Sequence, residues 1–269
     1  HLKNLKMETT ATRLTVEATV DAPVEKVWNH WTAPAHILKW NAASDDWQTT
    51  YSENDVRTGG KFATRMESRD GSMGFDFGGE YSNVEPLKKI ECVLGDGRYM
   101  EVNFTANGSE TKVTEIFEAE NENPVELQRG GWQAILNNFK KHAEGYTNLE
   151  LLRFEATINA PVEKVYTTML AEKTYREWTA EFNPTSNYRG SWEKSAKILF
   201  IGIDKDGAEG GMVSRIKENI PAKFISVEHL GLLQGDKEIT TGKEVEGWAG
   251  ALENYTFTAA NGGTRLVIE

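Results

Sequence analysis

Hydrophobic and polar positions alternate along most of the chain, and one such stretch leads into a motif that occurs twice. The apolar residues from Leu14 to Val20 alternate with polar ones, which predicts a half-buried strand over Thr12–Val20. This strand leads into Ala22–Trp28 (Ala-Pro-Val-Glu-Lys-Val-Trp), which recurs 138 residues later at Ala160–Tyr166 with only its last residue changed. Solenoid repeats are roughly 20–50 residues long, so this longer period indicates a duplicated domain.

Each copy of the motif predicts a short helix. Pro23 and Pro161 are suited to the first turn, and the residues before the motifs, Asp21 and Asn159, are candidate caps. A second short helix is predicted after Pro34 in the first copy, and over Thr174–Ala180 in the second.

Strand-like runs separated by glycine-containing turns follow both pairs of helices. Pairs such as Asp70-Gly71 and Asn107-Gly108 favour hairpins, so the strands should pair antiparallel as a meander. In the second copy, Asn183–Trp192 is an ambiguous edge segment and Gln234–Gly242 is a polar loop. The predicted strands are Asp45–Glu53, Gly60–Arg69, Met73–Val84, Lys88–Leu94, Arg98–Ala106 and Thr111–Glu120 in the first copy, and Leu149–Ile158, Ser195–Ile203, Gly211–Ile220, Lys223–Leu230, Gly247–Thr258 and Thr264–Glu269 in the second.

A long amphipathic helix is predicted over Pro124–Glu144 in the first copy alone. Its apolar stripe consists of Trp132, Ile135, Leu136, Phe139 and Ala143. A very short linker, Gly145–Asn148, precedes the second copy, so the predicted domains are residues 7–146 and 149–269, the second C-terminally incomplete. We therefore expect the natural chain to continue beyond Glu269 and supply the missing helix.

This order of elements resembles the START-like (SRPBCC, Bet v 1-like) helix-grip fold, an α+β fold. The first copy is also similar to the activator of heat-shock protein 90 ATPase homologue-like family. The matching segments are Ala22–Trp28, Gly59-Gly60-Lys61-Phe62, Asp70-Gly71 followed by Phe75–Tyr81, and Gly131-Trp132 with Ile135, Leu136 and Phe139. The resemblance implies two units with curved antiparallel sheets, and a cavity between the sheet and the long helix of the first.

Large aromatic side chains of the first copy are the candidates for lining that cavity. Each could instead simply pack between sheet and helix. Arg65, Asp76, Glu80 and Tyr81 would be polar anchors or an acid–base pair if they point inward, but alternation alone does not fix their register. The predicted ligand-binding residues are Trp31, Trp40, Phe62, Arg65, Phe75, Phe77, Tyr81, Trp132, Ile135 and Phe139.

No metal, cofactor or catalytic residue is predicted. His30 and His36 lie six residues apart near Asp45 and Asp46, but without a third histidine they are interpreted as two surface histidines. No nucleophile elbow, phosphate-binding loop or paired Ser/His/Asp arrangement is recognisable. Cys92 is the only cysteine, which excludes an internal disulfide, and its strand-like surroundings predict a buried, inert thiol.

Charge and hydropathy limit where the protein is expected to be located and which partners it is expected to bind. The net charge of −11 and the pI near 5.1 argue against nucleic acid as a partner. No apolar run reaches the roughly 20 residues that cross a bilayer, and no signal peptide is recognisable, so a cytoplasmic protein without membrane insertion is expected. Oligomeric state is left open.

Three functions are compatible with these features. The first is binding of a small hydrophobic or amphipathic ligand without turnover. The second is a chaperone-interacting, co-chaperone-like module, which the family resemblance implies. The third is a cyclase- or hydratase-type enzyme. Because fold resemblance does not fix function, we base the choice between them on the site.

Overall fold

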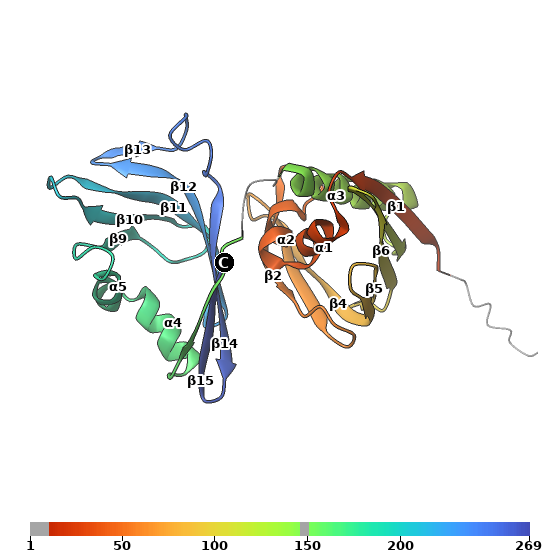
Figure 1. The fold of residues 1–269 in the computed structure, drawn as a ribbon, viewed down its shortest axis with the longest axis horizontal. Helices are drawn as coiled ribbons and strands as arrows, with labels where there is room; N and C mark the ends of the chain where they lie inside the picture. The colour runs from red at the N-terminus through yellow and green to blue at the C-terminus, as the bar shows by residue number, and fades with distance from the viewer. Residues whose placement is uncertain (1–10, 146–150) are drawn as a thin grey trace, which may run out of the picture. The chain divides into compact units, whose positions relative to one another are not determined.

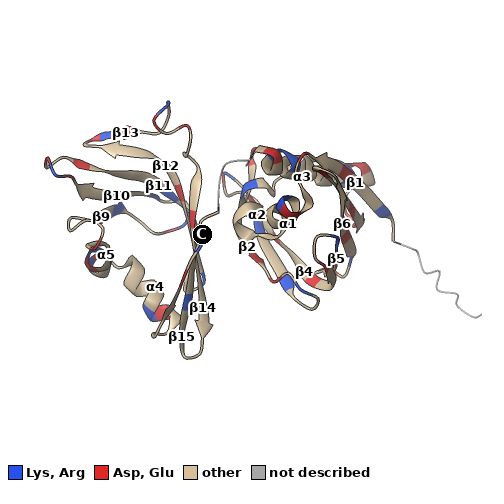
Figure 2. Ribbon diagram, viewed as in Figure 1, with Lys and Arg blue, Asp and Glu red and all other residues tan. Residues whose placement is uncertain are grey.

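The computed structural model describes residues 11–145 and 151–269. The chain divides into two compact units, His1–Leu149 and Glu150–Glu269, each with its own antiparallel sheet (Figure 1). The predicted linker lies outside the described residues except for Gly145. None of the described helices is long and apolar enough to span a membrane. Acidic and basic residues are interspersed along both units (Figure 2).

The first unit contains seven strands and three helices in the predicted order. The first strand of its sheet pairs with the last, giving the order β1-β7-β6-β5-β4-β3-β2. Its elements are β1 (Arg13–Val20), α1 (Val24–Thr32), α2 (Pro34–Trp40), β2 (Trp47–Asn54), β3 (Lys61–Ser68), β4 (Gly74–Glu85), β5 (Lys89–Leu94), β6 (Tyr99–Asn107), β7 (Glu110–Glu118) and α3 (Val125–Gly145).

The core of the first unit lies between this sheet and the helices. Leu136 and Phe139 of α3 are fully buried, as are Val113 and Phe117 of β7. Trp132 stacks on Phe117 with ring centroids 3.9 Å apart. The apolar stripe of α3 therefore packs onto the inward side chains of the central strands, as its spacing predicts.

Helix α3 also runs along β1, the edge strand of the sheet (Figure 1). Its polar side chains hydrogen-bond to backbone groups of alternate β1 residues and of the residue that follows the strand. Arg129 donates to the Thr15 carbonyl at 3.2 Å, Gln133 to the Glu17 carbonyl at 3.1 Å, and Lys140 to the Thr19 carbonyl, and the Asp21 amide donates to Glu144 at 2.9 Å. The helix thus covers an edge that would otherwise be open.

The second unit repeats the topology of the first, with sheet order β8-β15-β14-β12-β11-β10-β9. The predicted edge segment is confirmed as β9, and residues 151–269 contain no counterpart of α3. Its elements are β8 (Phe154–Ile158), α4 (Val162–Leu170), α5 (Glu172–Thr179), β9 (Asn187–Gly190), β10 (Lys197–Ile203), β11 (Glu209–Ile220), β12 (Phe224–Gln234), β13 (Lys237–Ile239), β14 (Ala251–Ala260) and β15 (Gly263–Ile268). The fold prediction of two START-like units is therefore confirmed.

Two local predictions are wrong. Asp21 and Asn159 do not cap α1 and α4. In both copies a turn places the proline itself at the N-cap position, where no side chain bonds to the helix. The segment Gln234–Gly242 is not loop throughout, because β13 forms within it and pairs with β12.

Candidate functional site

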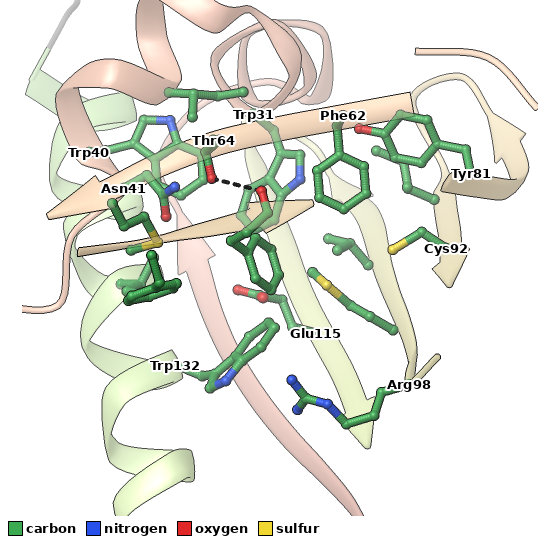
Figure 3. A pocket seen from close by; sticks show the side chains of 18 of the residues that line it. Trp31, Trp40, Asn41, Phe62, Thr64, Tyr81, Cys92, Arg98, Glu115 and Trp132 are labelled. Atoms are coloured by element: carbon green, nitrogen blue, oxygen red, sulfur yellow. Dashed lines mark hydrogen bonds between the residues drawn. The ribbon is translucent and has the colours of Figure 1, made fainter. Parts of the chain in front are cut away.

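A cavity of about 300 Å³ lies in the first unit between the sheet and the helices (Figure 3). Most of its lining is apolar, as expected for a small-molecule site. Eight of the ten predicted ligand-binding residues line this cavity, and their role in binding stays a prediction. They are Trp31, Trp40, Phe62, Phe75, Phe77, Tyr81, Trp132 and Ile135.

Arg65 and Phe139, the other two predicted residues, are not among the lining residues. Arg65 lies on β3, where its guanidinium approaches Asp76 at 3.3 Å and Glu67 at 3.6 Å. Phe139 is fully buried behind the cavity, with its ring edge-to-face against Trp31 and Trp40. Of the polar residues whose register was open, Asp76 and Glu80 are exposed, while Tyr81 is buried.

Glu115 is the one carboxyl group among the described residues that is deeply buried in the cavity wall. It lies on β7 between Val16 of β1 and Val102 of β6, and only 3% of it is exposed. Its Oε1 atom has no hydrogen-bond partner among the described residues, and its side chain reaches into the space between the aromatic rings (Figure 3). Burial raises the pKa of this carboxyl group to about 8, so it is largely protonated at neutral pH.

Other polar groups of the cavity are held by protein partners. The Tyr81 hydroxyl donates to Asn54 Oδ1 at 2.5 Å, the Thr64 hydroxyl donates to the Phe77 carbonyl at 3.2 Å, and Arg98 binds Asp96 at 2.8 Å. Burial raises the pKa of Tyr81, and it raises that of Cys92 to about 12. Cys92 is therefore buried and unreactive, as predicted.

The second unit has a larger cavity of about 680 Å³, and a histidine is among its lining residues. His229 Nδ1 lies 2.9 Å from the Ser214 hydroxyl, and its Nε2 lies 3.1 Å from a Glu253 carboxylate oxygen. Tyr255 also donates to Glu253. Burial opposes ionisation of Glu253, but these hydrogen bonds hold its pKa below the usual range. Sequence analysis missed this arrangement because its members lie on three different strands.

His30 and His36 are buried rather than on the surface, so that interpretation is wrong. They are 5% and 6% exposed, and α3 brings a third histidine, His142, against them. Asp45 and Asp46 are exposed and are not part of the cluster. The helices bury both histidines because α1 and α2 present them toward α3.

Comparison with known proteins identifies the family of the first unit. Residues 21–144 match the family described as Activator of Hsp90 ATPase homolog 1-like protein. An AHSA1-like protein from Aeromonas hydrophila is 39% identical over 52% of this chain and 99% of its own, with a TM-score of 0.48. The chain belongs to this family. The resemblance inferred from the sequence motifs is thus confirmed.

Two further solved structures are similar. The Cytophaga hutchinsonii protein Chr148 is 47% identical over 52% of this chain and 97% of its own, with a TM-score of 0.45. The di-domain ARO/CYC protein BexL, from the BE-7585A biosynthetic pathway, covers 96% of this chain and 83% of its own at 16% identity, with a TM-score of 0.51. At that identity the likeness to BexL shows the shared fold alone. No curated protein matches the chain.

Proposed function

We propose that the first unit of this member of the activator family binds a small, largely apolar ligand without transforming it. The observation that carries this proposal is the Glu115 carboxyl group, which is buried in the cavity wall with one oxygen that no described residue bonds. A buried polar group without a partner is costly, and a ligand group that satisfies it recovers that cost.

The protonated carboxyl group of Glu115 defines which ligands fit. It donates one hydrogen bond and accepts others, so it pairs with a carbonyl or hydroxyl group on an otherwise apolar molecule. An anionic group at the same place would be disfavoured once Glu115 ionises. The cavity of about 300 Å³ lies at the small end of the range for ligand pockets, so the ligand is compact.

Binding of the neutral fluorophore prodan, an aromatic ketone, tests this proposal. Glu115→Leu removes the donor, and we expect the affinity to fall about tenfold, equivalent to about 1.4 kcal/mol. Trp132→Ala removes part of the cavity wall and should also weaken binding. Phe139→Leu, behind the cavity, and Phe200→Leu, in the second cavity, are the controls and should bind as the unaltered chain does.

If prodan does not saturate a site on the unaltered chain, or if Phe200→Leu abolishes binding while Glu115→Leu does not, the proposal is wrong. Native mass spectrometry of the full chain from lysate complements this test, because a co-purified small molecule would identify the natural ligand class.

A second candidate function is acid–base catalysis in the second unit, of the cyclase or hydratase type. His229 favours it, because this imidazole lines a cavity and is oriented by the Glu253 carboxylate. Ser214 is fully buried, so it is better placed to orient His229 than to attack a substrate. The fold shared with the di-domain ARO/CYC proteins is compatible with this candidate.

Exchange of the α-protons of 1-phenyl-1,3-butanedione into deuterated water tests this second function. Catalysed exchange should be lost in His229→Gln and retained in His36→Gln of the first unit. Exchange at the uncatalysed rate with the unaltered chain would exclude it. A third candidate, a chaperone partner, comes from the family description alone, and stimulation of an Hsp90-type ATPase would support it.

A further inference from the structure

Three histidines from three helices converge in the first unit, separate from the cavity lining. His30 belongs to α1, His36 to α2 and His142 to α3, and each offers a ring nitrogen within 4.8 Å of the other two. All three side chains are buried, with 8% or less of each exposed. The chain has two further histidines: His1 lies outside the described residues, and His229 is not part of the cluster.

The hydrogen bond of His30 fixes which of its nitrogens can coordinate an ion. Its Nδ1 lies 2.8 Å from the Lys26 carbonyl oxygen. Because a carbonyl oxygen only accepts, Nδ1 carries the proton of the neutral ring and Nε2 carries the lone pair. An Nδ1–H bond to a backbone carbonyl is the usual way in which a metal-binding histidine is oriented.

The other two rings are already at the spacing of ligands on one ion. His36 Nδ1 and His142 Nε2 lie 3.0 Å apart. Two imidazoles bound at about 2.0–2.1 Å to a tetrahedral zinc ion have nitrogens roughly 3.3 Å apart. The His142 ring lies 5.4 Å from the His30 ring and 5.2 Å from the His36 ring between centroids, whereas the His30 and His36 rings are stacked with centroids 3.9 Å apart. These two rings must therefore separate and turn before three lone pairs meet at one point.

We propose that His30, His36 and His142 bind one divalent transition-metal ion through three imidazole nitrogens. The proton shared by His36 and His142 moves to the remote nitrogen of its ring, and a water molecule completes a tetrahedral site. An all-imidazole set suits Zn²⁺, Cu²⁺ and Ni²⁺ rather than Mg²⁺ or Ca²⁺. Three-histidine sites with one open position are established for zinc.

The surroundings of the three histidines favour binding of such an ion in one respect and oppose it in another. Burial lowers the pKa of His36 to about 4 and that of His142 to about 3, so the rings are neutral, which is the form that coordinates a metal. The positive charges of Lys26 and Lys39 act on the same rings and oppose a cation. We therefore expect an affinity weaker than that of a site with carboxylate or thiolate ligands.

Bound there, the ion would tie together the three helices that cover the first cavity. Trp31 and Ile37 line that cavity and directly follow His30 and His36 in the sequence. The proposed ion thus holds one wall of the cavity in place. It does not depend on the ligand proposal, because the metal is detected without any ligand.

Titration of the full chain with Co²⁺ tests the site, because tetrahedral Co²⁺ has intense visible absorption bands. We expect these bands to saturate at one equivalent per chain, and Zn²⁺ to displace the Co²⁺. His36→Gln and His142→Gln should each weaken binding at least roughly 100-fold, since removing a ligand costs more than the 10- to 100-fold typical of outer-shell partners. His1→Ala and His229→Gln are the controls, and the bands should be retained in both.

Nuclear magnetic resonance of the unaltered chain covers the case in which a variant unfolds. The ¹⁵N imidazole resonances of His30, His36 and His142 should shift together on addition of one equivalent of Zn²⁺, while those of His229 stay in place. Absence of saturable tetrahedral bands, retention of the bands in folded His142→Gln, their loss in His1→Ala, or no joint shift of the three rings would overturn the proposal.

Discussion

At the scale of single residues, Glu115 places a carboxyl group where the fold otherwise places apolar side chains. On β7 it belongs to the same inward series as Val113 and Phe117. An ionised carboxylate there would lose its hydration without gaining a partner, so the folded state favours the protonated form. The chain therefore tolerates a destabilising residue at the wall of its cavity, which is common at functional sites.

The stability of the first unit should fall as the pH rises from about 7 to about 8, above the range in which the histidines of the unfolded chain lose their protons. The pKa of Glu115 is raised to about 8 in the folded chain, so between these values the folded state holds a proton that the unfolded state has released. One proton held only by the folded state corresponds to a loss of about 1.4 kcal/mol per pH unit. Urea unfolding at several pH values should show this slope, and Glu115→Gln should remove most of it. Equal slopes in both proteins would contradict the prediction.

Part of what the structure shows about single residues could be predicted from the sequence. Alternation of Val113, Glu115 and Phe117 was visible, but it marks an inward carboxylate only once the core face of β7 is known. The three histidines could not be predicted, because His36 and His142 are 106 residues apart and meet only when α3 packs onto the short helices. Only the actual register of β4 shows that Tyr81 points inward and that Asp76 points outward.

At the scale of elements, α3 contributes more than an apolar stripe. Its polar side chains bond to the outer backbone groups of β1, which pairs with no other strand of the described residues on that side. The helix therefore stabilises the sheet through its core contacts and also closes its edge. Edge strands left open are sites of unwanted pairing with other chains.

Removing one of these bonds should open the edge of β1 locally. Gln133 accepts from the Glu17 amide at 3.4 Å and donates to the Glu17 carbonyl at 3.1 Å. In Gln133→Ala, hydrogen exchange at the Glu17 amide should be about five- to tenfold faster, since such a bond contributes about 1 kcal/mol. Lys141→Ala, on the exposed side of the same helix, is the matched control. Unchanged exchange at Glu17 would show that α3 does not protect the edge.

Elements with a clear period were predicted from the sequence, and those without one were not. Most of the strands, and α3, alternate or repeat over six or more residues, which is enough to identify them. The three-residue strand β13 lies in a polar segment and forms because β12 offers it a pairing edge. The predicted helix caps are wrong because the turn before each proline depends on the path of the preceding strand.

At the scale of the whole molecule, the two units share a topology but differ in how their sheets are covered. Among the described residues, nineteen buried hydrophobic side chains form the core cluster of the first unit, against eight in the second. The second unit also has the larger cavity. Because burial of apolar surface is the main stabilising contribution, the second unit should be the less stable one.

Thermal unfolding should therefore show two transitions, with the second unit melting first. Hydrogen exchange followed by mass spectrometry can assign them, because peptides from β14 and β15 should lose protection before those from β6 and β7. Val113→Ala should lower the upper transition, and Ile225→Ala the lower one. A single transition in which all of these peptides exchange together would refute the prediction.

The pairing of the first strand of each unit with its last has a consequence for how the chain is made. Arg13 of β1 pairs with Glu118 of β7, and Phe154 of β8 pairs with Ile268 of β15, so each sheet is completed by a contact spanning roughly a hundred residues. Contacts this distant in sequence slow folding. During synthesis β1 and β8 leave the ribosome long before their partners exist. Their apolar faces are exposed throughout that interval, in which aggregation competes with folding.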